Sequence, residues 1–119
     1  MNEQLDIFAF LYADLINNDL YPTKYNKKQI AQRISELTGL NFVRCEDGYY
    51  RASKNKALID FHFSTYADSN KMFIGVDWSY KTMGGGCPCD TLNEACEKIK
   101  QYIARVENER KQANKYSGS

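Results

Sequence analysis

The sequence predicts one α+β domain with two N-terminal helices, a three- to four-stranded antiparallel sheet and a long C-terminal helix. Three observations lead to this fold class. Apolar residues recur at helical spacing near both ends of the chain and alternate in its middle, and a length of 119 residues leaves room for one domain. In the resulting order, α-α-β-β-β-β-α, we expect the domain to span 1–116 and a disordered tail to span 117–119.

The composition limits the classes of protein to which this chain can belong. The chain is 43% hydrophobic and has a net charge of +1, so it can form a core but has no overall basic field for nucleic acid. No stretch approaches the 18 apolar residues of a membrane span, and the polar start, Met1–Gln4, is unlike a secretory signal. We therefore expect a cytoplasmic protein with reduced cysteines and no membrane association.

Residues 3–18 are predicted to form the first helix. Its apolar stripe consists of Leu5, Phe8, Leu11, Tyr12, Leu15 and Ile16. Phe10 lies off this stripe between Asp6 and Asp14. Either the helix is sandwiched between two layers, or Phe10 belongs to a contact surface for a partner.

The second predicted helix runs from about Lys27 to Leu37. Asn26 is placed as its N-cap, with Tyr25 and Ile30 forming a hydrophobic staple across it. Gly39 is the expected left-handed stop. The buried stripe of this helix would consist of Ile30, Ile34 and Leu37.

Alternating apolar residues predict four strands after this helix. They are Phe42–Cys45, Tyr49–Ala52, Ala57–Tyr66 and Lys71–Tyr80, with a turn at 46–48, a polar connection at 53–56 and a loop at 67–70. The last two strands have a testable register. If Tyr66 faces Lys71, every apolar residue of one strand meets an apolar residue of the other on one face: Phe63 with Ile74, Phe61 with Val76, and Ile59 with Trp78.

A glycine-rich loop is predicted over Lys81–Pro88, followed by a helix that starts near Thr91. Thr91 and Glu94 have the spacing of a capping box. The apolar stripe of this helix consists of Leu92, Ala95, Cys96, Ile99, Ile103 and Val106. Within the loop, Gly84–Gly86 ahead of a helix could cradle an anion, although the lysine and hydroxyl residue of a P-loop are missing; the alternatives are a mobile loop or close approach to a partner.

The same hairpin register places charged residues on the face opposite the core. Asp60 lies across from Asp77, with His62 beside them, and Arg51 or Lys56 could screen the like charges. One interpretation is a solvated polar face. The other is a weak metal site for Mg²⁺ or Mn²⁺, hence a metal-dependent hydrolase using Asp60, Asp77 and His62. Ser79 stands where nuclease folds with two acids on a hairpin usually carry lysine.

The four cysteines do not predict a zinc site. Cys87 and Cys89 are separated by one residue, whereas zinc knuckles separate their ligands by two to four. Cys96 falls on the helix stripe and Cys45 in a strand, as structural thiols do. No G-x-S-x-G pattern is present, and we expect no cofactor and no nucleophilic catalysis.

A basic stretch follows an acidic one. Lys24, Lys27, Lys28 and Arg33 carry four positive charges, whereas residues 1–19 hold four acidic residues and no basic one. This stretch, with neighbouring tyrosines at 21, 25, 49 and 50, could contact phosphates and stack on bases, or it could be a solvated helix face.

Two resemblances bear on function. From Lys27 onward the order of helix, strands and helix resembles double-stranded-RNA-binding domains, but these carry a lysine cluster at the start of the last helix, where this chain has Asp90, Thr91, Asn93 and Glu94. In size, in its bias towards Asn, Lys, Tyr and Ile, and in lacking an enzyme motif, the chain resembles small phage and mobile-element proteins that inhibit bacterial defence, including anti-CRISPR proteins. That resemblance implies a protein partner, or a trapped small signalling molecule, and assigns no residue a role.

The leading hypothesis is a non-enzymatic inhibitor that binds a protein partner, such as a bacterial defence component. The alternatives are nucleic-acid binding through the second helix and the hydrolase described above. The predicted binding residues are Phe10, Lys24, Lys27, Lys28, Arg33, Tyr80, Lys81 and Met83.

Overall fold

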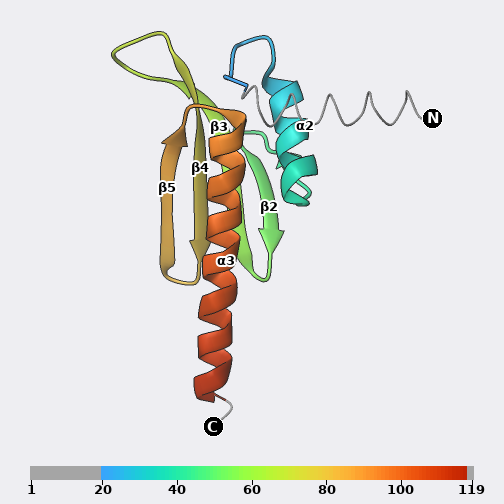
Figure 1. Cartoon of the computed structure of the whole chain (residues 1–119), viewed down its shortest axis with the longest axis vertical. Coiled ribbons are helices and arrows are strands. Elements are labelled where there is room, and N and C mark those ends of the chain that lie inside the picture. The colour runs from blue at the N-terminus through green and yellow to red at the C-terminus, as the bar shows by residue number, and fades with distance from the viewer. Residues whose placement is uncertain (1–19, 118–119) are drawn as a thin grey trace, which may run out of the picture.

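The computed structural model describes residues 20–117, which form two helices and a five-stranded antiparallel sheet (Figure 1). The elements are α2 (Lys27–Thr38), β1 (Val43–Arg44), β2 (Tyr50–Lys54), β3 (Ala57–Thr65), β4 (Met72–Tyr80), β5 (Met83–Cys89) and α3 (Leu92–Ser117). The strands are adjacent in chain order, so the sheet is a meander. The predicted α+β class is confirmed, but the prediction of three to four strands is wrong because there are five. The first predicted helix, with Phe10, lies outside the described residues.

Helix α2 begins at the predicted residue, Lys27, and ends at the predicted stop, but the expected N-cap and hydrophobic staple are wrong. Gly39 adopts φ 74°, and its N–H donates to the Ser35 carbonyl at 2.9 Å, as expected of a left-handed stop. Asn26 makes no side-chain cap. Instead its Oδ1 accepts the Thr23 N–H at 2.8 Å, shaping the turn before the helix. The predicted staple is also wrong, because Tyr25 is 85% exposed.

The β3–β4 hairpin has the predicted register in every pair. Phe63 lies opposite Ile74, Phe61 opposite Val76 and Ile59 opposite Trp78. A match of apolar residues on one face fixes register because a slip of one residue would turn each side chain to the other face. The predicted connection at 53–56 proves shorter: only Asn55 and Lys56 form the turn, both at positive φ, and residues 53 and 54 extend β2.

Strand β5 corrects the prediction of a loop over Lys81–Pro88. Each of its residues pairs with β4, and only Lys81 and Thr82 form the turn, with Lys81 at φ 55°. Glycine has low strand propensity, which is why the sequence indicated a loop. Space beside the glycines is tight, since a Cβ on Gly84 would lie 3.0 Å from the Trp78 carbonyl oxygen.

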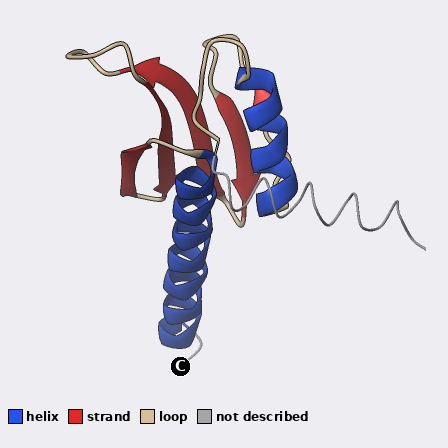
Figure 2. Cartoon of the chain, turned by 45° about the horizontal axis from the view of Figure 1, so that its top comes forward, coloured by secondary structure: helices blue, strands red, loops and turns tan. Residues whose placement is uncertain are grey.

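The core lies between one face of the sheet and the two helices, which pack side by side on that face (Figure 2). Its largest fully buried side chains are Phe61, Ile30, Ile34, Ile59, Ile74, Leu92, Ile99 and Val76. On α3, five of the six stripe residues are buried, and Ile103 is partly buried against the cluster. The opposite face is uncovered by any described helix or strand.

The start of α3 shows a modified capping box. Thr91 Oγ1 accepts the Glu94 N–H at 3.3 Å, as predicted, whereas the Glu94 carboxylate accepts the Asp90 N–H at 2.9 Å, one residue further back than expected. Neither α2 nor α3, as far as the structure describes the chain, has the length and apolar character needed to cross a membrane.

Candidate functional site

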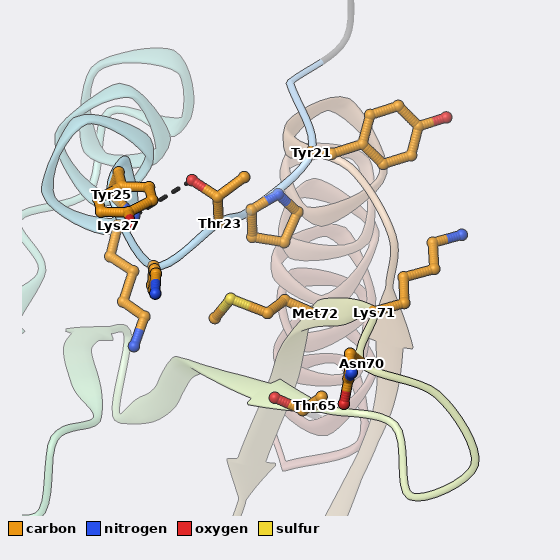
Figure 3. Close-up of a pocket in the computed structure, with 10 residues that line it drawn as sticks. Tyr21, Thr23, Tyr25, Lys27, Thr65, Asn70, Lys71 and Met72 are labelled. Atoms are coloured by element: carbon orange, nitrogen blue, oxygen red, sulfur yellow. Dashed lines mark hydrogen bonds between the residues drawn. The ribbon is translucent and has the colours of Figure 1, made fainter.

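A pocket lies between the segment that leads into α2 and the loop end of the β3–β4 hairpin (Figure 3). Its volume is about 690 Å³. We call it the lysine–tyrosine pocket; its lining residues are Tyr21, Pro22, Thr23, Lys24, Tyr25, Lys27, Thr65, Asn70, Lys71 and Met72. Two segments that lie 38 positions apart in sequence, from Lys27 to Thr65, therefore share one surface.

Two anchors hold these segments together. The Leu92 N–H donates to the Leu20 carbonyl at 2.8 Å, which ties the chain before the pocket to the first residue of α3. At the hairpin end, Tyr66 donates its hydroxyl hydrogen to Asp90 Oδ1 at 2.7 Å, and Lys71 Nζ lies 3.8 Å from Asp90 Oδ2. Both anchors meet at the start of α3, so the pocket is built on the core.

The pocket is basic and aromatic. Lys24 Nζ lies 5.1 Å from the centre of the Tyr25 ring, and Lys71 Nζ lies 5.7 Å from that of Tyr21, both within the range of a cation–π contact. Lys27 adds a third amine, and Asp90 offsets part of the charge. Tyr21 is 57% exposed and Tyr25 is 85% exposed, which is unusual for such large rings. These groups can bind an anionic surface and cover it with aromatic area.

The structure brings together two of the four predicted basic residues. Lys24 and Lys27 line the lysine–tyrosine pocket, whereas Lys28 lines a separate hollow beside Phe42 and Tyr50. Arg33 Nη1 forms an ion pair with Glu36 Oε2 at 2.8 Å on the surface of α2. Sequence reasoning missed Lys71, because nothing local to the hairpin loop indicates that it meets residues 21–27.

The predicted interface near the β4–β5 turn is mostly part of the core. The Tyr80 residue is 6% exposed, and Met83 is a partly buried residue packed against the core cluster. Lys81 is exposed in the turn, with its Nζ 5.3 Å from the centre of the Tyr80 ring. Of these three residues, Lys81 alone presents a largely exposed side chain to a partner.

The acidic pair on the open sheet face is arranged as the register predicted. Asp60 lies directly opposite Asp77, and Arg51, one of the two cations expected to screen them, lies with its Nε 3.4 Å from Asp60 Oδ2. Arg51 is shared, because its Nη2 also lies 2.8 Å from Asp47 Oδ2. Burial, followed by the nearby Asp77 charge, raises the pKa of Asp60 above its ordinary value.

His62 is held beside this pair by ring packing. Its imidazole stacks on Tyr49 with ring centres 4.4 Å apart, and its other side lies against Gly75, where a Cβ would overlap the ring. His62 Nδ1 lies 4.0 Å from Asp77 Oδ2. Neither this nitrogen nor Asp60 Oδ1 has a hydrogen-bond partner. The described residues contain no group of three His, Cys, Asp or Glu side chains able to hold a metal ion.

All four cysteines are free thiols, and each is buried or half-buried. Cys87 Sγ lies 3.9 Å from Cys89 Sγ, and Tyr102 donates its hydroxyl hydrogen to Cys87 Sγ at 3.6 Å. Burial raises the pKa of Cys89 to about 12, which keeps it a thiol at neutral pH. Cys96 is buried in α3, as the stripe predicted, and Cys45 is half-buried just after β1.

In comparisons with known proteins, no family model matches the chain, and no curated protein or solved structure matches it significantly.

Proposed function

We propose that this chain is a non-enzymatic binding protein that occludes a protein partner, and that the lysine–tyrosine pocket is its contact surface. The single observation that supports this most is the joining of three lysines and two exposed tyrosines in one hollow. Tyrosine is enriched among the residues that dominate binding energy in protein interfaces. The small size and residue bias suggest the counter-defence, anti-CRISPR type of inhibitor as the particular kind.

The chemistry of the pocket favours one kind of partner surface. The amines of Lys24, Lys27 and Lys71 favour carboxylates, and the exposed faces of Tyr21 and Tyr25 favour apolar or planar groups beside them. Such charges chiefly steer association and select the partner, while the rings supply buried area. An acidic protein surface with apolar neighbours satisfies both requirements.

A second candidate function is nucleic-acid binding, which the same pocket favours because amines can contact phosphates while tyrosines stack on bases. The net charge of +1 ranks it second, since the chain lacks the extended basic surface that supplies most non-specific affinity. The two candidates differ in what is bound and in how steeply binding falls with salt.

The test is affinity capture from bacterial lysate with wild-type protein and with a Lys24→Glu, Lys27→Glu variant, followed by binding of the purified captured protein. The matched control is Lys54→Glu, Lys100→Glu, which makes the same charge change at exposed positions outside the pocket. We expect a stoichiometric protein that binds wild type and the control equally, and the pocket variant at least about tenfold more weakly.

Two results would count against the proposal. Capture of nucleic acid alone, with affinity that falls steeply as salt rises and is lost in the pocket variant, would favour the second candidate. A captured protein whose affinity is equal for all three chains would show that the contact surface lies elsewhere.

A further inference from the structure

The outer edge of β5 presents free peptide groups whose positions follow from the hydrogen-bond pattern. The Tyr66 N–H donates to the Lys71 carbonyl at 3.0 Å, so this is a hydrogen-bonded pair, and such pairs alternate along an antiparallel ladder. Because the register is unbroken from β3 to β5, the odd-numbered residues of β5 bond to β4. The peptide groups of Gly84, Gly86 and Pro88 therefore point away from the sheet.

Among the described residues no strand covers the outer edge of β5, but only part of this edge can pair with another strand. The sheet order places β5 at one side, and no described strand pairs with its outer edge (Figure 1). Gly84 and Gly86 each offer a donor and an acceptor, whereas Pro88 offers an acceptor alone because proline has no N–H. A proline and a short edge strand both limit non-specific pairing with other chains. The part of the edge that can pair with another strand is therefore centred on Gly84–Gly86.

The Asp77 carboxylate lies beside this stretch, with His62 Nδ1 4.0 Å from its Oδ2. Asp77 is directly opposite Gly86, and its Oδ1 occupies the space that a Cβ on Gly86 would take, so the carboxylate lies over the glycine. The Asp77 side chain is 48% exposed. Among the described side chains, no lysine or arginine forms an ion pair with Asp77, and its cross-strand neighbour Asp60 carries a like charge.

We propose that the β5 edge binds an extended segment of a protein partner by strand addition, and that an arginine or lysine of this segment crosses Gly86 to reach Asp77. The peptide groups of Gly84 and Gly86 supply main-chain hydrogen bonds, and the carboxylate supplies selectivity. An added strand lies about 4.8 Å beyond β5, and the bare glycine lets a long side chain span that strand.

Charge complementarity disfavours pairing between the β5 edges of two copies of this chain. Strand β5 contains no basic residue, so pairing of two β5 edges would provide no cation for Asp77. It would instead bring the Asp77 carboxylates of two chains towards one interface, where like charges repel. The occupant in this proposal is therefore a different chain, with a basic residue in an extended segment. This inference depends on no residue of the lysine–tyrosine pocket.

The experiment is a titration of isotope-labelled full-length protein followed by amide NMR spectra. The probe is the acetylated and amidated pentapeptide Thr-Val-Arg-Val-Thr, and the matched probe replaces its arginine with glutamine. We expect the Arg peptide to shift the amides of Gly84 and Gly86 and to slow their hydrogen exchange. The Gln peptide should bind about three- to fivefold more weakly, the factor typical of an exposed ion pair.

Variants of the protein test whether the arginine of the peptide reaches Asp77. Asp77→Asn should reduce the affinity for the Arg peptide to that of the Gln peptide, whereas Asp68→Asn, the same change in the exposed 67–70 loop, should leave it unchanged. The inference is overturned if the Gly84 and Gly86 amides do not respond to about 5 mM Arg peptide, a concentration that detects millimolar binding. Equal affinity for the two peptides, or an unchanged affinity in Asp77→Asn, would overturn it as well.

Discussion

Tyr66 donates its hydroxyl hydrogen to Asp90 Oδ1 at 2.7 Å, and this bond joins the loop end of the β3–β4 hairpin to the start of α3. The other Asp90 oxygen lies 3.8 Å from Lys71 Nζ, so the same carboxylate positions a lysine of the lysine–tyrosine pocket. The hydrogen bond to Asp90 is the main cause that raises the pKa of Tyr66 to about 12. One aspartate thus couples the fold to the proposed contact surface.

Replacement of Tyr66 by phenylalanine should lower stability slightly at neutral pH, because it removes this bond and keeps the ring. The folded-state pKa of Tyr66, about 12, is above the unfolded value of 10.0, so the bond's contribution is complete below pH 10 and is lost as pH rises through about 12. Urea unfolding of both chains should therefore show a difference in stability that disappears near pH 12. A difference that stays constant over this range would contradict the assigned role of the hydroxyl.

Replacement of Asp77 by asparagine should stabilise the fold. Two like charges face each other across β3 and β4, and cross-strand pairs of this kind are worth tenths of a kcal/mol. We expect the free energy of unfolding to rise by about 0.5 kcal/mol at pH 7. The gain should fade in acid, because protonation of Asp60, whose pKa is raised in the folded state, removes one of the two like charges. Asp68→Asn is the control, and a loss of stability in Asp77→Asn alone would refute the repulsion.

Replacement of Gly75 by alanine should destabilise the sheet by about 2 kcal/mol, the usual cost of overpacking. A Cβ at this position would overlap the His62 ring, which cannot withdraw because Tyr49 stacks on its other side. The measurement is a double-mutant cycle. In a His62→Ala background the same substitution should cost much less, since the obstructing ring is gone. An equal cost in both backgrounds would mean that the ring is not the obstacle.

The sequence alone was sufficient to predict those features that depend on local residue pattern and strand register. Alternating apolar residues gave every pair of β3 with β4, and from that register the opposition of Asp60 and Asp77 followed without coordinates. The left-handed stop at Gly39 was likewise predictable from residue type.

Long-range packing accounts for what the sequence did not show. Glycines 84–86 have no intrinsic preference for a strand, and they form one because β4 offers free peptide groups. Trp78 leaves little space for a side chain at Gly84 and Gly85, and Asp77 does the same at Gly86. Tyr25 was expected to close a staple, yet the turn built by Asn26 leaves its ring exposed. Lys71 joins the pocket through Asp90, a contact over 19 residues that no periodicity encodes.

The most direct test of the proposed contact surface is site-specific photo-crosslinking in bacterial cells. A benzophenone amino acid replaces Tyr25, which is 85% exposed in the lysine–tyrosine pocket, and the control places it at Leu58, which is 50% exposed on the open sheet face. We predict that irradiation joins the chain to one protein from position 25 and not from position 58. An adduct to nucleic acid alone from position 25, or no adduct there, would contradict the proposal.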